Sequence, residues 1–140
     1  MSSRSLPALL LLLVACGGGG MLYSTLTATP SNAPQDAFDC ARSQLPKLEY
    51  EITSVDIHDR RITAKKNNSS VQRPESKFRG IIDKLEVEVG AGADGNTALT
   101  VVGHTFAEYF TVRGSTLTEE KASDDVNRAA QAVIQACGQP

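Results

Sequence analysis

Residues 79–90 read RGIIDKLEVEVG and carry the clearest secondary-structure signal of the chain. Their second half alternates apolar and charged side chains with a period of two, which predicts a β-strand with one face in a core and the other in water. The apolar positions are Leu85, Val87 and Val89, and the charged ones are Lys84, Glu86 and Glu88. A turn-like Ala93-Asp94-Gly95-Asn96 and a second β-rich stretch, residues 97–112, follow. Together they predict a long antiparallel hairpin.

The register of this hairpin depends on its turn. A two-residue turn at Asp94-Gly95 places Val102 and His104 on the apolar face of the first strand, whereas a slip of one residue places Leu99 and Val101 there. The sequence leaves both registers open, and with them the orientation of His104.

Further elements are predicted before this hairpin. Residues 48–55 and 61–66 are short strand candidates around a polar turn, which predicts a second hairpin. A helix is expected to begin near Pro34, with Asn32 or Ser31 as its cap, and to stop at Pro46.

A second helix is predicted near the C-terminus. Thr116 and Glu119 have the spacing of a capping box, and Gly138 ends the apolar stripe that follows. The stripe consists of Ala122, Val126, Ala129, Ala130, Val133 and Cys137. We therefore expect one α+β domain over residues 34–140, with two layers, about four strands in two antiparallel hairpins, and both helices on one face of the sheet.

Length and composition limit the classes of protein. With 140 residues, one domain is the ceiling, and a formal net charge of -2 argues against binding driven by nucleic-acid phosphates. Three Cys and two His leave few groups for metal or nucleophilic chemistry. We therefore expect no cofactor, no metal and no nucleic-acid partner, while the oligomeric state stays open.

The N-terminus has the three zones of an export signal: Arg4, a short apolar run, and small residues before Cys16. Residues 13–16, LVAC, resemble the lipobox of bacterial lipoproteins. The resemblance covers residues 1–16 and implies that 1–15 is a removed signal peptide and that Cys16 carries acyl chains. It also implies an extracytoplasmic domain, on the periplasmic side of the cell membrane or the outer membrane. Gly17 stands where the signal for retention in the cell membrane has an Asp, and its presence favours the outer membrane.

The stretch that follows the lipobox is rich in Gly, Ser, Thr and Pro. Residues 16–33 are therefore expected to form a flexible tether for the domain.

Cys40 and Cys137 lie one in each predicted helix of a chain that leaves the reducing cytosol. A disulfide between them is the natural interpretation, with two buried thiols as the alternative. The bridge requires both helices to pack together on the same side of the sheet.

Candidate catalytic groups are sparse. His58 lies among Asp56 and Asp59 in a polar turn without further ligands, and His104 lacks a recognisable partner motif. Glu86 and Glu88 share one strand face, which indicates a solvated surface. We therefore expect no catalytic residue.

Residues 60–84 carry eight basic side chains against two acidic ones, a net charge of +6. The residues expected to contact an anionic surface are Arg60, Arg61, Lys65, Lys66, Arg73, Lys77 and Arg79. In a tethered protein they suit an envelope protein or anionic lipid headgroups. A soluble, charged loop is the plainer interpretation.

The sequence thus favours a lipid-anchored envelope protein that binds or scaffolds another component without catalysis. Two alternatives stay open. One is a small-ligand or lipid binder with a pocket between helices and sheet. The other is an envelope hydrolase that uses His58 or His104.

Overall fold

The computed structural model describes residues 20–92 and 94–140. Cys16 and residues 1–15, expected to be a signal peptide, lie outside these residues. The elements in chain order are β1 (Ser24–Ala28), α1 (Pro34–Lys47), β2 (Glu51–Asp56), β3 (Arg61–Asn68), β4 (Phe78–Ala91), β5 (Thr97–Thr111), β6 (Gly114–Glu120) and α2 (Asp124–Cys137). None of the described helices is long and apolar enough to cross a bilayer.

The strands form one antiparallel sheet of six in the order β1-β5-β4-β3-β2. The sixth strand, β6, pairs with β5 on the same edge as β1 but further along, from Thr105 to Thr111. The α+β class is as expected, whereas the expected count of about four strands is wrong. The two additional strands, β1 and β6, are short, polar sequences at the sheet edge, where pairing with the backbone of β5 compensates for weak apolar patterning.

Strand β1 corrects the extent of the expected tether. Residues 24–28 pair with β5 from Ser24 opposite Gly103 to Ala28 opposite Leu99. Leu26 packs against the core. The segment that leads from Cys16 to the sheet is therefore short, because the domain begins about ten residues earlier than expected.

The start of each helix also differs from expectation. Thr116 and Glu119 belong to β6, and α2 is instead capped by Ser123, whose hydroxyl accepts a hydrogen bond from the Val126 amide at 3.0 Å. Helix α1 has Ala33 at its N-cap position without a side-chain cap, and Pro34 supplies the first helical residue.

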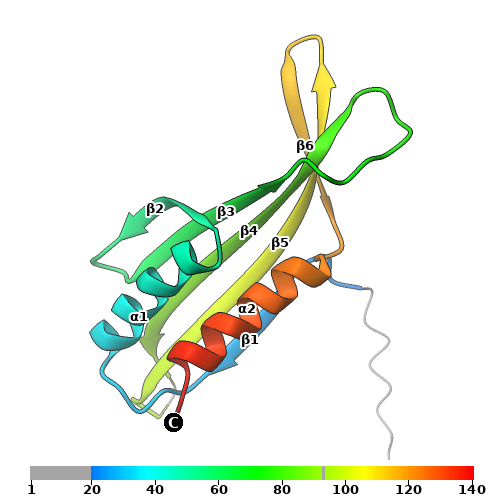
Figure 1. The fold of residues 1–140 in the computed structure, drawn as a ribbon. Coiled ribbons are helices and arrows are strands. Elements are labelled where there is room, and N and C mark those ends of the chain that lie inside the picture. Colours follow the sequence, from blue (N-terminus) through cyan, green and yellow to red (C-terminus); the bar gives the residue numbers. More distant parts are fainter. Residues whose placement is uncertain (1–19, 93) are drawn as a thin grey trace, which may run out of the picture.

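Both helices cover the same face of the sheet (Figure 1). In the β4–β5 register, Val87 lies opposite Val101 and Val89 opposite Leu99, and all four side chains are fully buried beneath the helices. The slipped register is thus the correct one, because the loop spans residues 92–96 rather than two residues.

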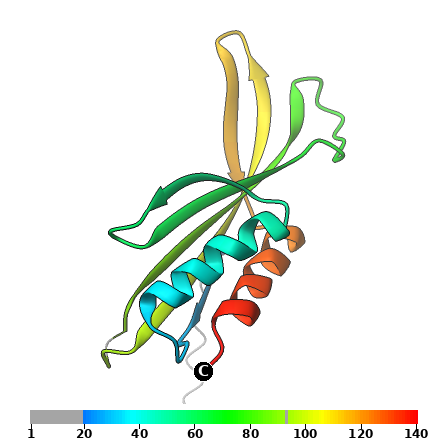
Figure 2. The ribbon, with the colours of Figure 1, turned by 60° about the vertical axis from the view of Figure 1, so that its left-hand side comes forward.

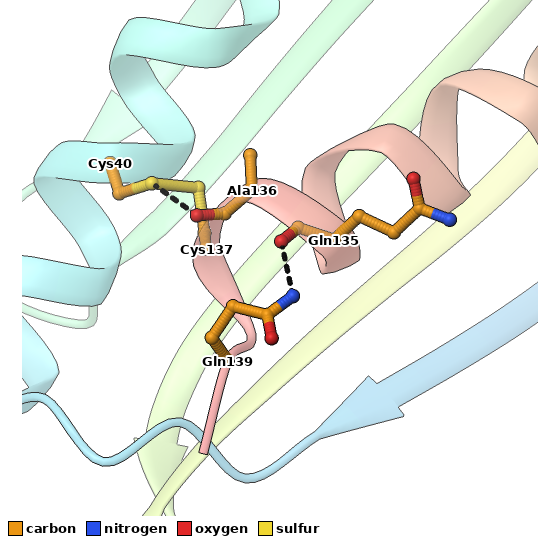
Figure 3. The surroundings of a disulfide bond; sticks show 5 residues. All are labelled: Cys40, Gln135, Ala136, Cys137 and Gln139. Atoms are coloured by element: carbon orange, nitrogen blue, oxygen red, sulfur yellow. Dashed lines mark hydrogen bonds between the residues drawn. A yellow bond between two sulfur atoms is a disulfide. The ribbon is translucent and has the colours of Figure 1, made fainter.

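A disulfide between Cys40 and Cys137 joins α1 to the end of α2 (Figure 3). The prediction of this bridge is confirmed. The two cysteines are 97 positions apart, and closing a loop of that length stabilises a folded chain by about 4–5 kcal/mol through the lost entropy of the unfolded state.

The sheet continues beyond the helices. The β5–β6 hairpin and the loop between β3 and β4 project away from the body at the end where α2 begins (Figures 1 and 2).

Candidate functional site

The face of the sheet that points away from the helices is the candidate functional site, and we call it the open face. Its side chains alternate with the core residues along β3, β4 and β5, β6 extends it beyond the core, and none of the described elements covers it. Its members are Arg61, Thr63, Lys65, Ile82, Lys84, Glu86, Glu88, Thr100, Val102, His104, Phe106, Leu117 and Glu119. This set mixes both signs of charge with isolated apolar side chains.

His104 lies at the centre of the open face, paired across the sheet with Lys84. Its Nδ1 is 2.7 Å from Oε1 of Glu119 and its Nε2 is 3.9 Å from Oε2 of Glu86. The rings of Tyr23 and Phe106 lie 5.5 and 6.0 Å from the imidazole, centre to centre. Carboxylates and aromatic rings therefore hold the imidazole in one orientation.

The side chains around His104 form a charged surface in which each group has a fixed neighbour. The Lys84 ammonium lies 2.6 Å from Oε1 of Glu86, so that carboxylate also has a cation beside it. In the described part of the chain, the hydrogen bond of the His104 ring goes to a carboxylate rather than to a serine or cysteine that would act as a nucleophile. The arrangement suits recognition of polar groups.

Two open hollows lie on this face. One, of about 410 Å³, is lined by Arg61, Thr63, Glu86, Glu88, Thr100 and Val102, together with backbone of the core positions between them. The other, of about 310 Å³, is lined by Thr53, Thr63, Lys65, Ile82, Lys84, Phe106 and Leu117. Each combines an apolar floor with charged sides, as the surfaces that receive side chains of a protein partner do.

A third hollow, of about 380 Å³, lies between the two helices and β3. It is lined by Leu48, Tyr50, Lys66, Asp125, Arg128, Ala129 and Ala132. The Tyr50 hydroxyl is buried and has no hydrogen-bond partner among the described residues. Burial raises the pKa of Tyr50 above its ordinary value, and the negative charges of Asp83 and Asp125 raise it further.

Asp83 is a buried carboxylate that anchors α2 to the sheet. It accepts hydrogen bonds from the hydroxyls of Thr105 at 2.6 Å and Ser123 at 2.9 Å. Ser123 also donates its amide to the Thr105 hydroxyl. Because every member of this network is tied to another, its role is to position the first turn of α2.

The seven basic residues expected to contact an anionic surface do not form one surface. Arg61 pairs with Glu88 at 3.3 Å and Lys66 with Glu49 at 3.0 Å. Lys65 lies on the open face beside Lys84. The alternation of β3 separates these side chains, because neighbouring residues of a strand point to opposite faces.

The other four basic residues lie elsewhere. Arg60 occupies the turn between β2 and β3, where its Nε is buried. Arg73 is bound to Glu120 by two hydrogen bonds of 2.5 and 2.6 Å, which raise the pKa of Arg73 and lower that of Glu120. Lys77 and Arg79 lie beside Phe110, near the turn of the projecting β5–β6 hairpin. Carboxylates from outside residues 60–84 therefore pair with four of the eight basic side chains of that segment, Arg61, Lys66, Arg73 and Lys84.

His58 lies in the exposed turn between β2 and β3, where Asp56 accepts a hydrogen bond from the Asp59 amide at 2.9 Å. Over residues 20–92 and 94–140, no cluster of His, Cys, Asp and Glu is arranged to hold a metal ion.

Three contacts of the site escaped sequence reasoning. Tyr23 reaches His104 because β1 is part of the sheet, and Glu119 reaches it because residues 114–120 form a strand. Leu117 is the one large apolar side chain of that strand, so its sequence offered no alternating apolar pattern as a signal. The pairing of Arg73 with Glu120 joins residues 47 positions apart, which no local pattern reveals.

Comparisons with known proteins found no match. Neither models of protein families nor curated proteins match this chain.

Proposed function

We propose that this chain is a lipid-anchored protein of a bacterial cell envelope and that it binds another envelope protein through the open face, without catalysis. The observation that carries the proposal is the sheet itself: one face is closed by two disulfide-linked helices, and the described elements leave the other uncovered. The lipobox resemblance at residues 13–16 supports the anchor.

The composition of the open face supports a protein as the partner. Ile82, Val102, Phe106 and Leu117 provide apolar contacts, while the charged pairs between them are partly exposed and offer both donors and acceptors. Interfaces between proteins combine apolar centres with polar groups in this manner. Charges of both signs also favour a partner of complementary pattern over a uniformly anionic one.

The anchor supports binding at a fixed place. Because β1 begins at Ser24, the seven residues 17–23 separate its start from Cys16, and the eight Cα-to-Cα steps between them span no more than about 28 Å when extended. The domain is thus held close to the bilayer, which raises the local concentration of membrane neighbours.

Site-directed photocrosslinking tests the proposal in cells. A photoreactive amino acid at Thr100, in the larger hollow of the open face, is expected to give a discrete adduct with an envelope protein. The same amino acid at Gln131, exposed on the outer side of α2, is the matched control and is expected to give none. Adducts of equal yield at both positions, or none at Thr100 in whole cells, would contradict binding through the open face.

A second candidate function is the binding of a small amphiphile in the hollow beside Tyr50. It is favoured by one observation, the buried Tyr50 hydroxyl, which has no hydrogen-bond partner among the described residues, at a hollow lined by both apolar and charged side chains. Native mass spectrometry of the purified protein tests it. A bound mass that is present with Tyr50 and lost in Tyr50→Phe supports this function, and the absence of any bound mass contradicts it.

A further inference from the structure

The turn of the β5–β6 hairpin exposes apolar side chains at the far end of the molecule. Val112 is fully exposed, and Phe110 and Leu117 are each about half exposed. They lie on the part of the sheet that projects beyond both helices (Figure 2). A hairpin turn is ordinarily polar, because its side chains face water on all sides. Apolar side chains exposed at such a turn indicate a surface that contacts another molecule or a membrane.

Basic side chains surround these apolar ones. The Arg79 guanidinium lies 4.1 Å from the centre of the Phe110 ring, and the Phe110 amide donates a hydrogen bond of 2.7 Å to the Lys77 carbonyl oxygen. Arg113 follows Val112 in the turn and is exposed. We call Lys77, Arg79, Phe110, Val112 and Arg113 the tip patch.

The charge at this end of the molecule is modestly positive. Glu75 and Glu108 are the acidic side chains adjacent to the tip patch in the chain, so three cations stand against two carboxylates. Arg73, the other nearby cation, is neutralised by Glu120. Aromatic and apolar side chains flanked by Lys and Arg are typical of segments that enter the interface of a bilayer.

The distance from the proposed anchor agrees with such a contact. Strand β1 begins at Ser24, opposite Gly103, and from Gly103 the chain runs nine residues to Val112, about 30 Å at strand spacing. From Ser24 back to Cys16 the reach is at most about 28 Å. The reach is slightly shorter than the hairpin, so a lipid anchor at Cys16 and the tip patch meet the same membrane surface when the chain before Ser24 is nearly extended and the hairpin is tilted from the membrane normal.

We propose that the tip patch is a second membrane contact, which places Phe110 and Val112 among the headgroups of an anionic bilayer and sets Lys77, Arg79 and Arg113 against lipid phosphates. The inference rests on the proposed envelope location. Two contacts fix the orientation of the domain, with the long axis of the hairpin directed at the bilayer and the open face turned sideways toward membrane neighbours.

The absence of tryptophan from the chain makes the test direct. Val112→Trp provides a single tryptophan at the tip, and Ile57→Trp, in the exposed β2–β3 turn, provides the matched control. Each full-length lipoprotein is reconstituted into vesicles of phosphatidylglycerol and phosphatidylethanolamine, and into vesicles of phosphatidylcholine. The readouts are the emission maximum and quenching by brominated acyl chains.

We expect emission of Val112→Trp to shift to shorter wavelength and to be quenched in the anionic vesicles, with a smaller effect in phosphatidylcholine, while Ile57→Trp does not change. Adding Lys77→Gln, Arg79→Gln and Arg113→Gln is expected to abolish the preference for anionic lipid. Emission of Val112→Trp equal to that in lipid-free detergent would overturn the proposal. A shift only when membrane proteins are present would also overturn it and assign the tip to a protein partner.

The same samples distinguish failure of the tip contact from failure of the lipid anchor. Co-flotation of Ile57→Trp with vesicles reports anchoring, whereas emission of Val112→Trp reports the tip. Floating protein without a shift at position 112 would leave the anchor in place and refute the tip contact.

Discussion

Arg73 and Glu120 form a two-pronged ion pair that ties the loop between β3 and β4 to the last residue of β6. Arg73 also donates a hydrogen bond to the Tyr109 hydroxyl at 3.4 Å and lies over the Phe78 ring, 4.9 Å from its centre. One side chain of the loop thus contacts residues of three strands, β4, β5 and β6, and holds the loop against the projecting end of the sheet.

Replacing Arg73 is expected to release this loop. Arg73→Gln removes the bidentate pair, so we expect a loss of about 1 kcal/mol in unfolding free energy and faster hydrogen exchange over residues 70–78. Arg61→Gln is the matched control, because its pair with Glu88 is more exposed; it is expected to change stability by less than about 0.5 kcal/mol. Equal effects of the two substitutions would contradict a clamping role for Arg73.

The stability effect of Arg73 is expected to depend on pH. Its guanidinium lowers the pKa of Glu120 in the folded protein, so the pair stabilises the fold above the ordinary glutamate pKa. That contribution is lost as the pH falls through the lowered pKa, because the protonated carboxyl no longer carries charge. Urea unfolding of the parent and Arg73→Gln proteins should therefore differ at pH 7 and converge once the pH is below the lowered pKa of Glu120. A difference that persists unchanged at acid pH would contradict this account.

The disulfide is expected to be the largest single covalent contribution to stability. The double substitution Cys40→Ser and Cys137→Ser should lower the unfolding free energy by about 4 kcal/mol, because the unfolded chain regains the entropy of a loop closed across 97 positions. Guanidinium unfolding measures the loss, with the parent protein under reducing conditions as the comparison. Alkylation of both thiols in the non-reduced protein would show that the bridge does not form.

Ser123 is expected to determine where α2 starts. Ser123→Ala removes both the cap on Val126 and the hydroxyl donated to Asp83, so it should cost about 1–2 kcal/mol and fray the first helical turn. Ser115→Ala in the exposed strand β6 serves as the control and should be nearly neutral. Thermal unfolding and amide exchange near Val126 provide the measurement, and unchanged protection there would contradict the capping role.

Lipid attachment at Cys16 has its own test. Cells fed radioactive palmitate are expected to label the parent protein, whereas Cys16→Ser should stay unlabelled and keep residues 1–15 because lipobox cleavage follows acylation. Cys40→Ser should retain the label and is the control for cysteine loss. A parent protein without label would remove the basis of the anchor.

Much of the fold was readable from local patterns. The alternation around Leu85, Val87 and Val89 marked the central strand, and the cysteines at 40 and 137 indicated that two helices lie together. These signals are readable because burial of one strand face and the closure of a disulfide impose simple rules on the residues involved. The expected helices, hairpins and bridge follow from these rules, although the helix caps and the strand count do not.

The open face was not readable in this way. His104 acquires its neighbours from β1, β4 and β6, and whether it faced the core depended on a loop of residues 92–96 whose length no turn motif revealed. Backbone pairing with β5 holds the edge strand β6 in place. Such a strand needs no buried apolar side chains, so its sequence carries almost no apolar pattern.

By itself, the sequence determined which residues have an apolar face, where a disulfide was available and that the N-terminus resembles a lipobox. Only the tertiary structure decided the hairpin register, the two added edge strands and which carboxylates pair with half of the basic side chains of residues 60–84. The physical reason is range: periodicity reports burial within one element, whereas ion pairs such as Arg73 with Glu120 form between residues that only the folded chain brings together.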